Sequence, residues 1–197
     1  MSRASPAPAP RRTLTSFALL AVAATVLSTL TVLGLRWAAG PHKPAAAQPQ
    51  LHIGFTRLDL RAPGLALPSL SGRGTVSLTM LAGQPIVLNL WSTTCGVCKK
   101  ETPALAAVAG RLRGKVRFLG VDSADSRGPA TAFATRYKVP YPIAFDPRAT
   151  AAAAYRVGVL PVTFFLSSSG RTILGVNFGA LTVPGLYRIL RTLYGVT

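Results

Sequence analysis

Cysteine and histidine are scarce in this chain of 197 residues, which has two of each. Two cysteines exclude a scaffold held by several disulfides, and they exclude a zinc site built from four cysteines. The histidines, His42 and His52, both precede the part of the chain that we expect to fold. A metal site made from Cys95, Cys98 and one of these histidines is therefore disfavoured, and we predict no metal and no other cofactor.

Acidic residues are also few, with 5 Asp and Glu against 22 Lys and Arg and a formal net charge of +17. Such an excess of positive charge can attract nucleic acid or an anionic membrane surface. No Lys/Arg-rich block interleaved with aromatic residues occurs in the sequence, so we predict no nucleic-acid partner. Attraction to anionic lipid headgroups fits better, because the folded part is expected to lie beside a membrane.

A long uncharged run near the N-terminus predicts a membrane anchor. Residues 1–13 are rich in Pro and Ala, and we expect a cytoplasmic tail without fixed structure. Residues 14–35 carry no charge, and a helix of that length, at ~1.5 Å per residue, measures ~33 Å, enough to cross the hydrocarbon core. Arg11 and Arg12 precede the run and favour a cytoplasmic N-terminus. We therefore predict a single-pass anchor at 14–36 in the cytoplasmic membrane, with the catalytic domain on its extracytoplasmic side.

A cleaved signal peptide is the alternative to this anchor. Its apolar region would span ~7–15 residues and end at a small-x-small site. The run at 14–35 is longer, and the candidate site Ala45-Ala-Ala47 lies well beyond it. A twin-arginine signal matches poorly after the arginine pair. Both alternatives still place the domain outside the cytoplasm. Residues 37–61 are predicted to be a linker, and residues 62–197 the folded domain.

Alternation of strands and helices predicts an α/β fold with a mixed central sheet flanked by helices. Residues 86–91 form a continuous apolar run, typical of a central strand buried on both faces. A helix is expected from Gly96 to about Arg113, with a kink at Pro103. Further strands are expected at 65–70, 75–78, 116–121, 142–145, 162–166 and 172–176, and further helical segments at 79–82, 129–137, 148–156 and 184–193.

The two cysteines lie two residues apart, where the predicted strand leads into the predicted helix. Helix amides and the helix dipole near the first sulfur stabilise a thiolate and lower its pKa from the free value of ~8.5. We expect Cys95 to attack a partner disulfide and Cys98 to resolve the mixed disulfide. A purely structural disulfide would stabilise little, because so short a loop removes little entropy from the unfolded chain. Half of a metal site is disfavoured because no second cysteine pair exists.

These features resemble the thioredoxin superfamily and are most similar to its membrane-tethered ResA/TlpA/CcmG-type branch. The resemblance spans about Ala62 to the C-terminus and depends on motifs in the expected order: Gly83-Gln-Pro85, Val87-Leu-Asn-Leu-Trp91, Cys95-Gly-Val-Cys-Lys-Lys-Glu-Thr-Pro103, Tyr141-Pro-Ile-Ala-Phe-Asp146 and Tyr155-Arg-Val-Gly-Val-Leu-Pro-Val-Thr-Phe-Phe165. It implies a thioredoxin-like fold, a redox-active Cys95–Cys98 disulfide, protein thiols or disulfides as substrates, and a membrane thiol as electron donor.

The resemblance also assigns a substrate surface. The proline that matches Pro161 has a cis peptide bond in this superfamily and lies against the cysteine pair, and a cis bond suits an X-Pro position. The backbone of Leu160 would then be offered to an extended substrate segment. Trp91 and Thr94 are assigned to the same surface. Thr94 departs from the family, which usually has Trp before the first cysteine, so the range of partners is expected to differ.

Glu101 is the candidate acid or base. In ResA-like proteins the glutamate at this place tunes the thiols and proton transfer, and a carboxylate near a thiol raises the pKa of that thiol. The alternative is a surface glutamate paired with Lys99 or Arg111. Asn89 stands where cytosolic thioredoxins usually have a buried aspartate, which again favours the tethered branch.

We therefore predict a membrane-tethered thiol–disulfide oxidoreductase that reduces protein disulfides, including those of apocytochrome c during cytochrome c maturation, as the resemblance implies. An oxidase or isomerase that forms disulfides in exported proteins is the alternative, since the residues between the cysteines do not determine the direction. A thiol peroxidase is disfavoured because Ser92 and Leu88 stand where its motif needs other residues. A copper carrier is disfavoured because no histidine follows His52.

Overall fold

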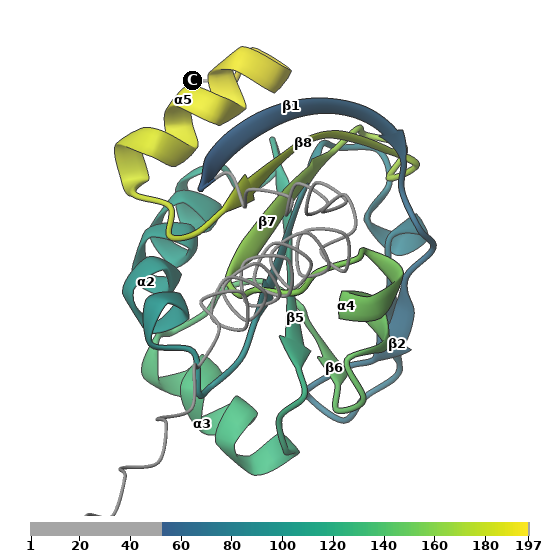
Figure 1. Ribbon diagram of the computed structural model, residues 1–197, viewed down its shortest axis with the longest axis vertical. Helices are drawn as coiled ribbons and strands as arrows, with labels where there is room; N and C mark the ends of the chain where they lie inside the picture. The colour runs from purple at the N-terminus through teal and green to yellow at the C-terminus, as the bar shows by residue number, and fades with distance from the viewer. Residues whose placement is uncertain (1–52, 197) are drawn as a thin grey trace, which may run out of the picture. The chain divides into compact units, whose positions relative to one another are not determined.

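A six-stranded mixed sheet organises residues 53–196, which are the residues that the computed structural model describes (Figure 1). Three strands are parallel, β4, β5 and β6, whereas β7, β8 and β1 continue the sheet antiparallel from β4. The strands in spatial order are β1 (Gly54–Arg61), β8 (Thr172–Phe178), β7 (Val162–Leu166), β4 (Ile86–Trp91), β5 (Arg117–Ser123) and β6 (Ile143–Asp146). The predicted mixed sheet is confirmed.

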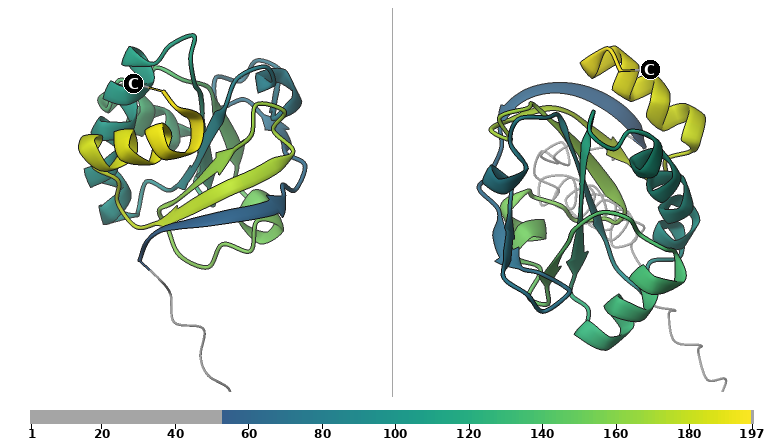
Figure 2. Two further views of the ribbon diagram at one scale, coloured as in Figure 1. Left: turned by 90° about the horizontal axis from the view of Figure 1, so that it is seen from above. Right: turned by 180° about the vertical axis from the view of Figure 1, so that it is seen from behind.

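Helices cover both faces of this sheet (Figures 1 and 2). On one side lie α2 (Gly96–Arg111), α3 (Arg127–Arg136) and α5 (Val183–Tyr194). On the other lie the short α4 (Thr150–Ala154), the hairpin of β2 (Ala66–Pro68) and β3 (Thr75–Ser77), and the 3-10 turn η1 (Thr79–Leu81). The α/β layering expected from the sequence is therefore present.

The central strand β4 is buried along its whole length, as its unbroken apolar run predicts. Successive side chains of a strand point to opposite faces. Accordingly Val87 packs with residues of α2 and α5, whereas Leu88 and Leu90 pack in a second cluster with α4 and the hairpin. A strand placed between two apolar layers has a fixed register. It delivers the following turn, with Cys95, to the carboxyl edge of the parallel strands.

The start of the folded domain corrects the sequence prediction. Residues 54–61 were expected to end a linker, but they form the edge strand β1, paired with β8. The Phe55 ring lies 5.9 Å from the Phe165 ring, edge to face. Gly175 makes room for it, because a Cβ there would lie 2.5 Å from Phe55. Most β1 side chains are exposed and several are charged, so the sequence of this edge strand resembles that of a linker.

The remaining predicted elements are confirmed, β7 with the predicted ends and the others with shifted ends, and α4 shows the largest difference. The sequence suggested a helix over 148–156. Ala149 instead has a left-handed conformation with φ of 53°, and the Asp146 carboxylate accepts hydrogen bonds from the amides of Thr150 and Ala151. This cap begins the helix at Thr150. Arg156, with φ of 54°, lies just beyond its end.

The predicted tail at 1–13, the anchor at 14–36 and the linker residues up to 52 lie outside the described residues. No helix within residues 53–196 is both long enough and apolar enough to cross a membrane.

Candidate active site: a cysteine pair at the start of a helix

Cys95 is the N-cap residue of α2, directly after the turn that follows β4. Its Sγ accepts a hydrogen bond of 3.0 Å from the backbone amide of Cys98, and the two cysteines form a disulfide with 5.2 Å between their Cα atoms. A backbone amide of the first helical turn, that of Cys98, therefore points at the outer sulfur. Such donors stabilise negative charge, which is the state that a nucleophilic thiol must adopt.

Access to the two sulfurs differs. Cys95 is half-buried, whereas Cys98 is 0% exposed and packs with Trp91, Ala130 and Phe133. A partner's sulfur can therefore reach Cys95 but not Cys98. This arrangement fits the predicted division of roles between an attacking and a resolving cysteine.

The structure places only some of the residues assigned to the substrate surface at an accessible hollow. The Leu160–Pro161 peptide bond is cis, as the resemblance implies. Leu160 and Thr94 line one hollow of about 280 Å³ beside the turn that carries Cys95. Trp91 is only 3% exposed and stacks on Phe133 at 4.3 Å. Trp91 thus supports the turn from inside and does not line this hollow.

Glu101 is completely buried on the face of α2 that also carries Cys98. Its Oε1 accepts a 2.8 Å hydrogen bond from the Asn89 side chain, and its Oε2 accepts one of 3.1 Å from the Leu181 amide. Burial raises the pKa of Glu101 to about 7, although both hydrogen bonds lower it. The alternative of a surface glutamate paired with Lys99 or Arg111 is therefore wrong. Glu101 follows Cys98 by three residues, so the two residues are neighbours on the surface of the helix.

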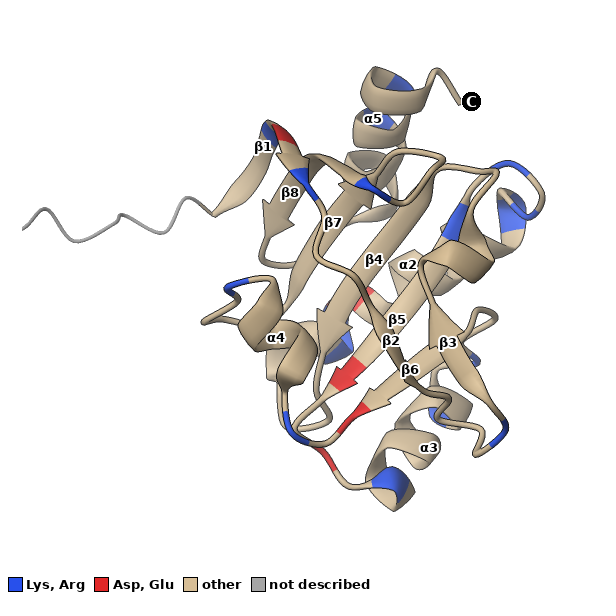
Figure 3. Cartoon of the chain, turned by 90° about the vertical axis from the view of Figure 1, so that its right-hand side faces the viewer, with Lys and Arg blue, Asp and Glu red and all other residues tan. Residues whose placement is uncertain are grey.

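Three aspartates beside the cysteine turn were not identified as site residues from the sequence. Asp122 is the penultimate residue of β5, Asp146 ends β6, and Asp125 lies in the loop that leads to α3; Figure 3 shows red segments in this region. The Asp125 carboxylate accepts hydrogen bonds from both the amide and the hydroxyl of Thr93. The sequence contained one indication that these aspartates lie near the cysteines. The carboxyl ends of parallel strands meet at one edge of a sheet, and Cys95 follows β4, which is parallel to β5 and β6.

Metal ligands are not grouped in this region. Among residues 53–196, no three His, Cys, Asp or Glu side chains are arranged so as to hold a metal ion.

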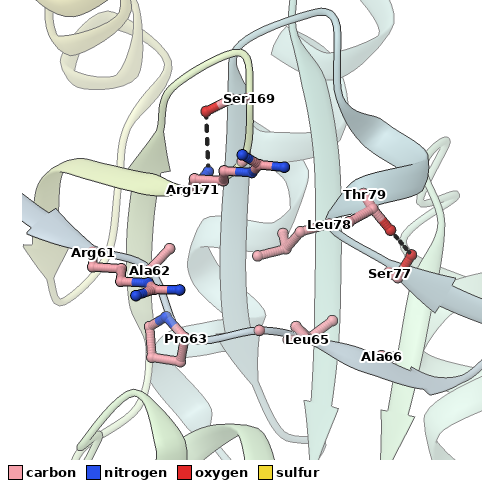
Figure 4. Close-up of a pocket in the computed structure, with 12 residues that line it drawn as sticks. Arg61, Ala62, Pro63, Leu65, Ala66, Ser77, Leu78, Thr79, Ser169 and Arg171 are labelled. Atoms are coloured by element: carbon pink, nitrogen blue, oxygen red, sulfur yellow. Dashed lines mark hydrogen bonds between the residues drawn. The ribbon is translucent and has the colours of Figure 1, made fainter.

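A hollow larger than the one beside the cysteine turn lies away from the cysteines. Its volume is about 680 Å³, and it lies between the turn joining β7 to β8 and the segment around Pro63 (Figure 4). Gly170 in its wall approaches Ile86, which starts β4, whereas Cys95 follows the end of that strand. None of the predicted site residues lines it.

Comparison with known proteins agrees with this geometry. The model of the AhpC/TSA family matches residues 59–173, more than half of the 197-residue chain. The chain belongs to the AhpC/TSA family. This family membership, together with the thioredoxin-like fold, confirms the superfamily that the motifs indicated.

Two relatives of this AhpC/TSA protein are named thiol-disulfide oxidoreductase ResA. The one from Bacillus subtilis is 30% identical over 122 residues, which cover 61% of this chain and 67% of the relative. The one from Bacillus cereus is 27% identical over 113 residues, covering 57% of this chain and 65% of the relative. The chain thus spans about two thirds of the length of these relatives. Both names agree with a redox function for the cysteine pair.

A solved structure provides the corresponding likeness in three dimensions. The crystal structure of a DsbF homologue from Corynebacterium diphtheriae has a TM-score of 0.65 and 26% sequence identity, covering 74% of this chain and 96% of that chain. The described domain therefore has a thioredoxin-like fold and belongs to the thiol–disulfide oxidoreductase class, as predicted.

Proposed function

We propose that this protein is a membrane-tethered thiol–disulfide oxidoreductase that acts outside the cytoplasm and reduces disulfides of partner proteins. Cys95 is the nucleophile and Cys98 the resolving cysteine. The observation that carries this proposal is the disulfide at the first turn of α2, with one half-buried and one fully buried sulfur.

The reaction starts from the reduced cysteine pair. The Cys95 thiolate attacks one sulfur of the partner disulfide, whose S–S bond breaks while its other sulfur leaves as a thiolate and takes up a proton. The mixed disulfide is then attacked by Cys98, which reforms the Cys95–Cys98 bond and releases the partner as a dithiol. Two electrons have passed to the partner, and a membrane thiol donor restores the reduced pair.

The carboxyl groups around the pair support the reducing direction. A stabilised thiolate favours the reduced form of a protein and makes that protein an oxidant, whereas a destabilised thiolate makes it a reductant. Glu101 lies one helical turn after Cys98 and ionises near neutral pH. Its negative charge opposes a thiolate on Cys98.

The sequence supports both the tether and the partner. The uncharged run at 14–35 and the arginines before it support an anchor with the domain outside. The resemblance to the ResA/TlpA/CcmG-type branch supports apocytochrome c as the partner, which would be reduced before haem attachment.

The second candidate is an oxidase or isomerase for exported proteins. The hydrogen bond from the Cys98 amide to the Cys95 sulfur supports it, because this bond stabilises a Cys95 thiolate and hence the reduced form. The preferred direction of electron transfer therefore depends on which effect on the reduced form is larger, its stabilisation by the helix amide at Cys95 or its destabilisation by the carboxyl group on the helix turn after Cys98.

The reduction potential distinguishes the two candidates. Equilibration of the full chain with a glutathione or thioredoxin standard should give a value near ~−270 mV or lower for a reductase. A value near ~−120 mV would instead establish the oxidase candidate.

Trapping identifies the partner and tests the two cysteine roles. Cys98→Ser leaves the mixed disulfide unresolved, so partners should accumulate on Cys95. Cys95→Ser is the matched control, and it should trap at least about tenfold less because Cys98 is buried. Equal trapping by the two variants would contradict the assignment. Recovery of apocytochrome c on Cys98→Ser would support the proposed substrate.

A further inference from the structure

The proposed reaction leaves one buried acidic group beside the active site without a role. Asp122 is the penultimate residue of β5, where it pairs with Trp91 of β4, and it is 0% exposed. Neither of its carboxylate oxygens accepts a hydrogen bond from any donor within residues 53–196. A buried carboxylate without donors is costly, so Asp122 strongly favours its protonated form.

The groups that face Asp122 add to this effect. Burial, which is the largest cause, and the neighbouring carboxyl groups of Asp125 and Asp146 together raise the pKa of Asp122 to about 8. Arg127 of α3 does not compensate, because its guanidinium donates to two backbone carbonyls, including that of Leu70, and lies 4.3 Å from the Phe145 ring.

From β4 and α2, Asp122 is approached by groups of the active site itself. Trp91 is its partner across the strands and packs in one cluster with Cys98 and Cys95. The titratable groups on this side therefore include the thiols of the reduced pair and the carboxyl group of Glu101, which is buried on α2 together with Cys98.

Asp125 connects this buried carboxyl to the cysteine turn. Its Oδ2 accepts the Thr93 amide proton, and its Oδ1 accepts the Thr93 hydroxyl proton at 2.9 Å. Thr93 precedes Cys95 by two residues, so these bonds fix the backbone that presents the reactive sulfur. Asp125 also lines the hollow shared by Thr94 and Leu160.

We propose that Asp125 is a positioning residue for thiol–disulfide exchange, which fixes the turn before Cys95 through its hydrogen bonds with Thr93. The protonation state of Asp122, behind Asp125, makes these hydrogen bonds depend on pH. While Asp122 is protonated, the Asp125 carboxylate binds Thr93 without a competing charge. When Asp122 loses its proton, two adjacent carboxylates repel each other, and Asp125 is displaced from Thr93. The inference rests on the proposed function only in taking Cys95 as the attacking thiol.

Two substitutions of Asp125 distinguish the effect of its charge from the effect of its hydrogen bonds. In Asp125→Asn the amide oxygen still accepts from the Thr93 amide and the amide NH₂ donates to the Thr93 hydroxyl, so the hold remains without its charge. Asp125→Ala removes both the charge and the hold. Asp59→Asn, an exposed carboxylate on the edge strand β1, is the control for a general change of charge.

Exchange kinetics test the positioning role. The full-length reduced chain is reacted with a small disulfide, such as oxidised glutathione, at pH 7. We expect Asp125→Ala to lower the exchange rate about tenfold relative to Asp125→Asn, since misplacement of a reacting group costs up to about a hundredfold. Iodoacetamide alkylation of Cys95 at pH 6 should become about three to ten times faster in Asp125→Asn, because one unit charge near the thiol is lost. Equal exchange rates for the Asn and Ala variants would overturn the positioning role.

A titration of the oxidised chain tests the part played by Asp122, because the disulfide-bonded cysteines then do not titrate. The Thr93 amide resonance of the ¹⁵N-threonine-labelled full chain is followed from pH 6 to 10 in a Glu101→Gln background, which removes the ionisation of Glu101. We expect an inflection near pH 8 that Asp122→Asn abolishes and Asp59→Asn retains. An inflection that persists in Asp122→Asn, or no inflection at all, would overturn the pH-dependent hold. Neither the kinetic measurements nor the titration depends on the direction of electron flow or on a protein partner. Their outcomes would therefore stand even if the proposed function were wrong.

Discussion

At the scale of single residues, Glu101 shows how burial prepares an ordinary side chain for redox chemistry. It lies on α2 three residues after Cys98, and both are fully buried. Asn89 and Leu181 donate to its two oxygens, so it is held in one orientation. A carboxyl with a pKa of about 7 is partly ionised at neutral pH. We propose that it takes or gives a proton when Cys98 closes or opens the disulfide.

Replacing Glu101 by Gln tests this proton-transfer role. The variant keeps an acceptor oxygen but cannot ionise, so we expect the pH–rate profile of disulfide exchange to lose its step near pH 7. The reduction potential should rise by about 30 mV, because no carboxylate then opposes a Cys98 thiolate. Stopped-flow exchange with a small disulfide measures the profile.

The matched control for Glu101→Gln is Thr102→Val. Thr102 is also buried, and its hydroxyl donates to the Cys98 carbonyl at 2.7 Å without ionising. This variant should keep the step near pH 7. A Glu101→Gln profile that retains the step would exclude Glu101 as its source.

At the scale of elements, the sequence predicted the strands with two buried faces better than the edge of the sheet. Ile86–Trp91 and Val162–Leu166 were placed residue for residue, because both are unbroken apolar runs. The edge strand Gly54–Arg61 was missed because few of its side chains, among them Phe55 and Leu58, pack against the core, and charged residues interrupt it. Edge strands lack the hydrophobic pattern that identifies central ones.

The candidate site was also predicted only in part: single residues were identified from the sequence, but contacts between distant segments were not. Cys95 and Cys98 follow from residue type and spacing, and Glu101 from its place in the resemblance. The hydrogen bonds from Thr93 to Asp125 join residues 32 positions apart. Periodicity indicates which side chains are buried, but it does not indicate which side chains of different elements meet.

A substitution in β1 tests whether this edge strand belongs to the domain. Phe55→Ala removes the ring that packs on Phe165 and covers Gly175, so we expect a loss of about 1–3 kcal/mol in the free energy of unfolding. Leu60→Ala in the same strand removes a side chain that is 55% exposed, and it should change stability by less than about 0.5 kcal/mol. Urea denaturation measures both variants. Equal effects would mean that Phe55 contributes nothing specific to the packing.

At the scale of the whole molecule, two buried carboxyl groups link stability to pH. The pKa of Glu101 rises from 4.5 to about 7 on folding, and that of Asp122 from 3.8 to about 8. Between these values the native state holds protons that the unfolded chain has already released. Stability falls with rising pH wherever the native state binds more protons than the unfolded state. The oxidised protein should therefore become less stable from about pH 5 to pH 8, and change little above that.

Replacement of Asp122, whose pKa is shifted more than that of Glu101, tests this dependence of stability on pH. The wild-type free energy of unfolding should drop by on the order of 6 kcal/mol between pH 5 and pH 8, with both cysteines oxidised. Asp122→Asn cannot ionise, so it should lose more than half of that drop and be more stable than wild type at pH 8. Asp59→Asn, whose carboxyl lies on the exposed side of β1, should keep the wild-type slope. Urea denaturation at the two pH values gives the free energies. If Asp122→Asn followed the wild-type curve, the proton held by the native state would have to lie elsewhere, and the link between this carboxyl and the cysteine turn would lose its thermodynamic basis.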